Sequence, residues 1–177
     1  MTGAQPPAAN AGGSAADGAA DGPADGAAGR LAALGLTLPP VAAPGGAYVP
    51  AVRTGGYVYT AGQLPTVDGK LPVTGKVGAE VSVPEAAGLA RTCALNAVAA
   101  AAAAAGGLAA IRRIVKVTGF VASAPGFGSQ PQVINGASEL LLEVFGEDGR
   151  HARSAVGVAE LPLNSPVEVE LIAEVRD

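Results

Sequence analysis

The sequence is poor in the residue types that build metal centres, disulfides and aromatic stacking sites. Its 177 residues include one cysteine, one histidine and no tryptophan, and only 3% are aromatic. A single cysteine excludes an internal disulfide and a thiolate cluster. One cysteine with one histidine also falls short of the ligand set of a usual zinc site. We therefore expect a protein that works without a metal or a cofactor.

Charge clusters and long apolar stretches are also lacking. The formal net charge is −4, and the basic residues are scattered along the chain, whereas a nucleic-acid binder gathers them into a patch. The opening residues MTGAQPPAANAGG have neither the basic nor the apolar region of a secretion signal. The most apolar stretch, residues 97–105, is mostly alanine and shorter than a membrane span. We expect a cytoplasmic protein with no nucleic-acid and no membrane partner.

The first 29 residues differ in composition from the rest. They consist mainly of alanine, glycine, aspartate and proline, with a loose Ala-Asp-Gly repeat. A segment without large apolar side chains cannot offset the entropy cost of its own ordering. We predict a disordered tail over residues 1–29 and one folded domain over residues 30–177.

The folded domain is predicted to open with a hairpin and a long helix. Order is expected from Arg30, where RLAAL indicates a helical turn or two. The segments AYVPAVRT and YVYTAG are rich in β-branched and aromatic residues and flank Gly55-Gly56, which is typical of a tight hairpin turn. Ser82 and Glu85 then form a capping box for a helix that continues to Ala105.

The second half of the chain returns to strands. Residues 112–123 alternate as a strand with Val115, Val117, Gly119 and Val121 on one face. Pro131 opens a second helix with apolar residues at helical spacing. Two strands, about 153–160 and 167–175, follow as an antiparallel hairpin around the LPLNSP turn. The order ββ-α-β-α-ββ predicts an α+β fold with one sheet covered on a single face by two helices. The other, valine-rich face is expected to be hidden by self-association.

Arg153 and a row of glutamates carry the candidate chemistry. Glu168, Glu170 and Glu174 alternate with apolar residues in the last strand and therefore share one face. If the last two strands pair around the turn, Arg153 lies roughly opposite residues 168–170, and the guanidinium neighbours a carboxylate. From the pattern alone this is either a surface ion pair, worth under about 1 kcal/mol, or a site at which the guanidinium holds a planar carboxylate.

Two segments resemble the signatures of the RidA/YjgF family. ARSAVGVAELPLNSPVEVELIAEV has the family's Arg-Ser opening, Ala-x-Leu-Pro turn and Val-Glu at the head of the last strand. YVPAVRTGGYVYTAGQLP is similar to the N-terminal hairpin with its Gly-Gln-(Ile/Leu)-Pro ending. The resemblance covers about residues 30–176. It implies a chorismate-mutase-like fold, a homotrimer with clefts between subunits and, in the deaminase branch, hydrolysis of enamines and imines such as 2-aminoacrylate to 2-keto acids and ammonia.

The resemblance also implies roles for individual residues. Arg153 matches the arginine that clamps the substrate carboxylate, and Glu168 matches the carboxylate that orients the attacking water. Tyr48 matches a pocket tyrosine supplied by the neighbouring subunit, and Asn135 matches an asparagine that lines the pocket. Ala155 falls where a main-chain carbonyl faces the substrate nitrogen. Such a set suits imine hydrolysis, which needs positioning and one proton-handling group more than a strong nucleophile.

The chain departs from the family pattern at four positions. Ala61 replaces a serine found in many members and so removes a pocket hydroxyl. His151 stands two residues before the arginine, where a small residue or proline is usual, and Gly157 stands where glutamate is common. Asn135 aligns only with a one-residue insertion before Arg153. A deaminase of small 2-imino acids is our first interpretation, and a trimeric protein that binds small carboxylates without turnover is the second. A different hydrolase or a nuclease is a third.

His151 and Cys93 each allow two interpretations. His151 is either an exposed residue of a glycine-rich turn or a proton shuttle. Cys93 is either a small core residue or a reactive thiol. A nucleophile pair made from the two would lack an orienting group. Tyr57 and Tyr59 alternate along a predicted strand, which indicates sheet packing rather than ligand stacking.

Overall fold

The computed structural model describes residues 26–176 of the chain. Most of the tail predicted for residues 1–29 therefore lies outside the described residues. The first helix begins at Ala27, three residues before the predicted start of order at Arg30. In chain order the elements are α1 (Ala27–Ala33), β1 (Ala51–Thr54), β2 (Tyr57–Thr60), α2 (Val83–Ala105), η1 (Leu108–Ala110), β3 (Ile111–Ala122), α3 (Gln130–Phe145), η2 (Gly146–Gly149), β4 (Ala152–Val158), η3 (Pro162–Asn164) and β5 (Val167–Val175).

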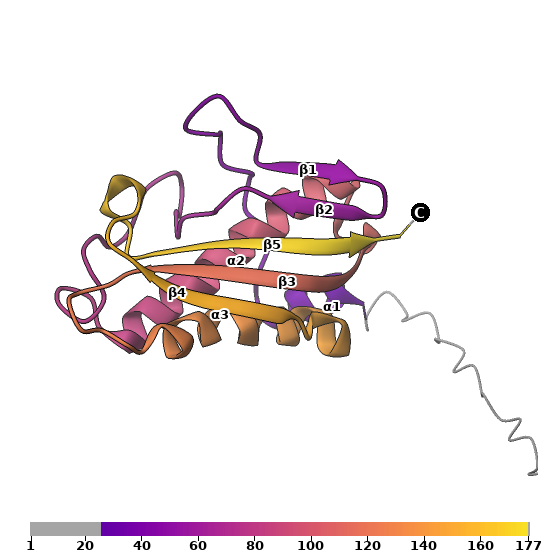
Figure 1. The fold of residues 1–177 in the computed structure, drawn as a ribbon. Helices are drawn as coiled ribbons and strands as arrows, with labels where there is room; N and C mark the ends of the chain where they lie inside the picture. Colours follow the sequence, from indigo (N-terminus) through magenta and orange to yellow (C-terminus); the bar gives the residue numbers. More distant parts are fainter. Residues whose placement is uncertain (1–25, 177) are drawn as a thin grey trace, which may run out of the picture.

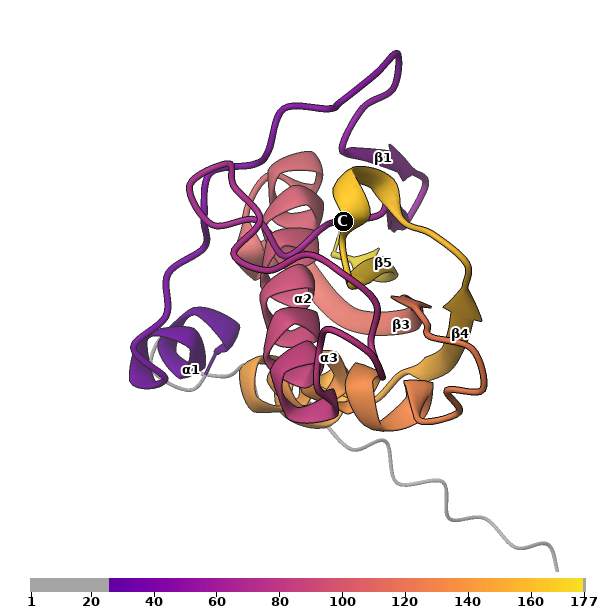
Figure 2. The same cartoon turned by 90° about the vertical axis from the view of Figure 1, so that its left-hand side faces the viewer.

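One five-stranded sheet and two long helices form two layers (Figure 1). The strand order is β1-β2-β5-β3-β4, with β3 and β4 parallel and the other neighbours antiparallel. Both α2 and α3 lie on one side of the sheet, its helix-covered face, and α1 packs against α3 (Figure 2). The opposite side is the open face. The predicted α+β architecture, one sheet covered on a single face by two helices, is confirmed.

Helix α2 forms where its capping signals predict. Ser82 is extended, and its Oγ accepts a hydrogen bond from the Glu85 amide at 3.4 Å. Gly106 ends the helix in the left-handed region, with φ of 95°. Among the described residues α2 is the one helix long and apolar enough to cross a membrane, but 67% of that window is buried inside the fold. This burial is that of a core helix, whose alanines allow a close approach to the sheet.

The register at the start of β3 differs from the prediction. Val117, Gly119 and Val121 share one face, which is buried, but Ile114 instead of Val115 is the next buried residue before them. A shift in the pairing with β5 between Ile114 and Lys116 marks a β-bulge, which changes the alternation of the strand. Valine suits either face, so the pattern alone did not reveal the bulge.

The predicted pairing of the last two strands is wrong. β3 lies between β4 and β5, parallel to the first and antiparallel to the second. The segment β3-α3-β4 is a crossover unit, in which a helix joins parallel strands, and this leaves β4 at the sheet edge. β5 suits the centre because its inward residues are all apolar and buried, namely Val167, Val169, Leu171, Ala173 and Val175.

The open face presents large apolar side chains to solvent. Four of them are between 42% and 53% exposed, namely Val52, Tyr57, Tyr59 and Val156. The strand pairings place these four around the half-buried Ile172 and Phe120. The same face also carries Lys116, Glu168 and Glu170. Exposed apolar side chains gathered on one face are typical of a surface that another molecule covers.

Candidate functional site

Arg153 is held against α3 by two hydrogen bonds. Its Nη1 donates to Asn135 Oδ1 at 2.8 Å and to Ser138 Oγ at 3.1 Å. Asn135 and Ser138 are three residues apart and so share one side of the helix. Arg153 reaches them because its β3 partner is the buried Val117, which places both side chains on the helix-covered face.

His151 extends this network behind the arginine. Its Nδ1 lies 2.6 Å from the Gly149 carbonyl oxygen, and its Nε2 lies 3.1 Å from Ser138 Oγ. A carbonyl oxygen only accepts, so Nδ1 carries the hydrogen and Nε2 of the neutral ring accepts from the Ser138 hydroxyl. Burial lowers the pKa of His151, and the charge of Arg153 lowers it further, while the bond to Gly149 opposes both. The His151 side chain is half-buried, so it is not an exposed residue of a turn.

We call Arg153, Asn135, Ser138 and His151 the arginine cluster. Among the described residues no hydrogen bond engages Nε or Nη2 of Arg153. The guanidinium therefore keeps N–H donors for a ligand while Nη1 fixes its orientation. Ala155 follows two residues later on the same edge strand, so it points to the same face of the sheet. This arrangement suits the binding of a planar anion at the β4 edge.

Glu168 lies on the other side of the sheet. It is a half-buried residue of the open face, and its carboxylate lies directly against Gly62, where a Cβ atom would have no room. Burial raises the pKa of Glu168, and the neighbouring Glu170 raises it further. A glutamate with a raised pKa exchanges protons closer to neutral pH than an ordinary one.

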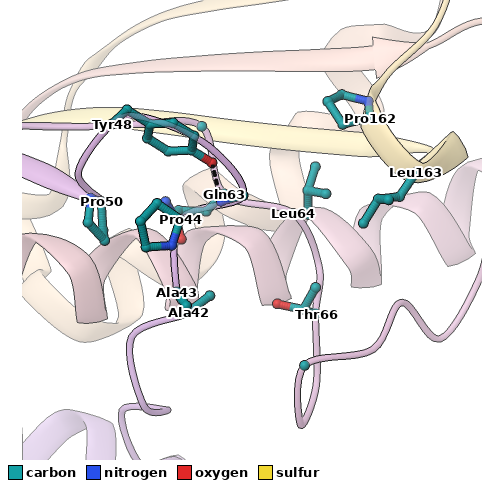
Figure 3. Close-up of a pocket in the computed structure, with 13 residues that line it drawn as sticks. Ala42, Ala43, Pro44, Tyr48, Pro50, Gln63, Leu64, Thr66, Pro162 and Leu163 are labelled. Atoms are coloured by element: carbon teal, nitrogen blue, oxygen red, sulfur yellow. Dashed lines mark hydrogen bonds between the residues drawn. The ribbon is translucent and has the colours of Figure 1, made fainter.

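Tyr48 lines a cavity (Figure 3). Gly62 is also among the residues that line it. The tyrosine is 52% exposed, and its hydroxyl accepts a hydrogen bond from the Gly45 amide at 3.2 Å. The cavity measures about 620 Å³, and no charged side chain is among its lining residues, which include Pro44, Leu64, Pro162 and Leu163. We call Glu168, Gly62 and Tyr48 the carboxylate cluster.

Ala61 lies beside this cluster and contributes only main-chain bonds. Its amide donates to the Pro50 carbonyl oxygen at 2.8 Å, and its own carbonyl oxygen accepts from Gln63 Nε2 at 3.2 Å. A serine at this position would add a hydroxyl next to Gly62. The chain therefore keeps the backbone of the predicted pocket segment but not the side-chain donor.

The two clusters of one chain lie on opposite faces of the sheet. Arg153 aligns across β3 with Leu171, and Glu168 is three residues before Leu171 on β5. Two strand spacings of about 4.8 Å and three residues of about 3.3 Å separate the two backbone positions by roughly 14 Å. An odd offset in a strand also reverses the face. The predicted Arg153–Glu168 neighbourhood is therefore wrong within one chain, whereas Arg153 and Asn135 do come together.

The sequence interpretation missed Ser138. The available signal was its spacing of three residues from Asn135 on a helix whose other inward residues are apolar. Cys93, in contrast, is a fully buried core residue whose Sγ lies 3.6 Å from the Val167 carbonyl oxygen. Burial raises the pKa of its thiol well above the usual value. Both ring nitrogens of His151 are engaged elsewhere, so the two residues form no nucleophile pair.

The chain is thus an α+β protein with one sheet covered by two helices and an arginine held in a fixed orientation at the sheet edge. A family model described as "YjgF/chorismate_mutase-like, putative endoribonuclease" matches residues 28–175. The chain belongs to this family, as its two signature segments predicted. The family match also confirms the chorismate-mutase-like fold.

Three proteins illustrate the similarity. Protein TCP17 of Trypanosoma cruzi is 47% identical over 154 residues, which are 84% of this chain and 96% of that protein. The crystal structure of Atu1372 from Agrobacterium tumefaciens is 50% identical and covers 84% of this chain and 91% of its own, with a TM-score of 0.77. E. coli TdcF, solved with bound serine, is 29% identical over 79% of this chain and 94% of its own, with a TM-score of 0.54.

Proposed function

We propose that this protein hydrolyses small enamines and imines of the 2-aminoacrylate type to 2-keto acids and ammonia. The observation that carries the proposal is the orientation of Arg153. Asn135 and Ser138 hold one guanidinium nitrogen, and the remaining N–H donors are left for a carboxylate. Arginine suits this task because its planar fork matches a carboxylate and stays charged at every relevant pH.

Glu168 handles the water in this proposal. The imine nitrogen first takes a proton from solvent, and Glu168 takes a proton from water as the water oxygen adds to the imine carbon. Glu168 then returns that proton to the nitrogen of the carbinolamine. The C–N bond breaks, the hydroxyl oxygen becomes the carbonyl and releases its proton to solvent, and ammonia leaves. The keto acid remains on Arg153 until it dissociates. The raised pKa of Glu168 supports this role, because one group must both accept and return a proton near neutral pH.

Catalysis in this scheme needs two copies of the chain. Arg153 and Glu168 leave the sheet on opposite faces, so one chain cannot direct both at a small ligand. We propose that the arginine cluster of one subunit meets the carboxylate cluster of the next, including Tyr48, in a homotrimer. The exposed apolar side chains of the open face supply a surface that such an assembly would bury. We place this activity in the cytoplasm.

The relatives support a ligand of amino-acid type. TdcF was solved with serine, a small molecule with one carboxylate. The family description also names an endoribonuclease, but the net charge of −4 does not favour a polyanionic substrate. Ala61 favours the second candidate, a carboxylate-binding protein without turnover, because it removes a hydroxyl from the pocket segment.

The proposal is tested by ammonia and keto-acid release from imines generated in situ by an amino-acid oxidase. We expect wild type to accelerate release and Arg153→Ala to abolish the acceleration. Arg91→Ala is the matched control, because Arg91 forms an ion pair with Glu143 on the helix surface and should leave the rate unchanged. Acceleration that survives in Arg153→Ala would contradict the proposal. No acceleration in wild type, with keto acids still bound, would favour the binding protein, and cleavage of RNA would favour the nuclease.

A further inference from the structure

His151 is a titratable side chain that is hydrogen-bonded to the network holding the proposed carboxylate clamp. A continuous chain of hydrogen bonds links the Gly149 carbonyl, His151, the Ser138 hydroxyl and Arg153. His151 and Arg153 are two residues apart in the sequence, but the hydrogen bonds that connect their side chains run through Ser138 of α3. We infer that His151, acting through Ser138, couples the binding of a carboxylate at Arg153 to the uptake of a proton. The inference rests on the proposed function only in taking Arg153 as the carboxylate clamp.

The Ser138 hydroxyl is the element that changes state. It has one hydrogen to donate and two lone pairs to accept with. One lone pair accepts from Arg153 Nη1, and the hydrogen goes to Nε2 of neutral His151. When His151 is protonated, Nε2 becomes a donor and occupies the second lone pair. The hydroxyl hydrogen is then released and can turn toward a carboxylate held at Arg153, which gains a donor.

The charges favour the same direction of coupling. The positive charge of Arg153 disfavours a second positive charge on His151. A bound carboxylate neutralises the guanidinium, so it should raise the pKa of His151. By reciprocity a protonated His151 should bind the carboxylate more tightly. Affinity should therefore rise as the pH falls through the pKa of His151 and level off on either side.

Other charged groups on the surrounding elements must be separated from this effect. They include Glu139 and Glu143 of α3, Glu147 and Asp148 of η2, Arg150 before β4, Arg113 and Lys116 of β3, and Arg30 of α1, which donates to the Val144 carbonyl oxygen. Glu147 and Arg150 pair with each other at 2.7 Å, and Lys116 donates to Ser154 at 2.9 Å. Glu139 is exposed one residue after Ser138, so Glu139→Gln is a control for a nearby change of charge. Glu168 of a second subunit also titrates, so the measurements are repeated in Glu168→Gln.

The single histidine makes the coupling directly measurable. Because the chain contains one histidine, the untagged full-length protein gives one set of imidazole NMR signals, whose pH titration reports the pKa of His151. The titration is carried out without ligand and with saturating 2-oxobutanoate, a stable keto acid. The dissociation constant of 2-oxobutanoate is measured calorimetrically over the same pH range. Linkage fixes the ratio of the low-pH affinity to the high-pH affinity. That ratio must equal ten raised to the power of the change in the pKa of His151 on keto-acid binding.

We expect the keto acid to raise the pKa of His151 and the affinity to increase roughly three- to ten-fold from high to low pH, as for charges a few ångströms apart in a partly exposed site. His151→Gln keeps a hydrogen-bonding side chain but does not titrate, so its affinity should not depend on pH. Ser138→Ala should reduce the dependence, whereas Glu139→Gln should keep it. If the coupling is observed but the protein does not hydrolyse imines, the proposed deaminase activity is wrong and this inference still holds.

Three results would overturn the inference. The first is a pKa of His151 that is the same with and without saturating keto acid. The second is a pH dependence of affinity that His151→Gln leaves intact. The third is an absence of keto-acid binding at any pH in wild type.

Discussion

The arginine cluster and the carboxylate cluster differ in how firmly they are held. Each member of the first has a hydrogen-bond partner within it, and Nη1 of Arg153 has two. Among the described residues the Glu168 carboxylate has no hydrogen bond, and it lies against Gly62. The arginine cluster is thus already organised within a single chain, whereas the Glu168 carboxylate of the other cluster can still accept hydrogen bonds.

This difference indicates which half depends on assembly. A guanidinium that is oriented in advance can bind a carboxylate with little further loss of entropy. A half-buried carboxylate with a raised pKa is destabilising until a ligand, a water molecule or another chain satisfies it. Binding should therefore depend mainly on the arginine cluster, and turnover on both clusters together. The substitutions below test that division.

The largest effect is expected for Glu168→Gln. Loss of the proton-handling group should lower kcat for imine hydrolysis roughly hundred-fold or more, while the affinity for 2-oxobutanoate changes little. The pKa of Glu168 is raised in the folded state, so ionisation of Glu168 lowers stability as the pH rises through that raised value. The neutral variant should therefore have a higher Tm at pH 7. A variant that loses affinity and turnover in equal proportion would show that Glu168 belongs to binding instead.

A smaller effect is expected for Gly62→Ala. The added methyl has no room beside the Glu168 carboxylate and must displace it. We expect kcat/KM to fall roughly ten-fold, since misplacing a catalytic group by about 1 Å is costly. Gly56→Ala is the matched control, because a Cβ there meets no atom within 4 Å. Equal activities of the two variants in the ammonia-release assay would mean that the position of Glu168 does not matter.

The smallest effect is expected for Asn135→Ala. Arg153 would lose one of the two acceptors that orient Nη1 but keep Ser138. Removal of one such bond from a partly exposed group costs about 1 kcal/mol, so the dissociation constant of 2-oxobutanoate should rise about five-fold. Calorimetric titration at fixed pH measures this change. An unchanged affinity would mean that Ser138 alone orients the guanidinium.

The helices and strands were predicted better from the sequence than the order in which the strands pair in the sheet. The N-cap of Ser82, which accepts from the Glu85 amide, and the alternation in β5 are local signals, and both are borne out. The position of β5 between β2 and β3 follows from competition among whole strands for the buried centre, which local patterns do not report. For that reason the pairing of Arg153 with the glutamates was predicted wrongly.

The same limit applies to the site. Family motifs marked Arg153 and Asn135, which lie together, but Ser138 and the engagement of His151 depend on how α3 packs over β4. The β-bulge between Ile114 and Lys116 is likewise set by pairing with β5. Side chains that meet through tertiary packing were the ones that sequence reasoning could not bring together.

Subunit complementation shows whether two copies of the chain complete one site. Arg153→Ala and Glu168→Gln chains are co-expressed in equal amounts and purified as mixed assemblies, with each variant alone as control. If Arg153 and Glu168 come from different subunits, random assembly should restore about a quarter of the wild-type sites and of the imine-hydrolysis rate. If the mixed assemblies are as inactive as each variant alone, although the subunits have mixed, the two clusters do not act across an interface.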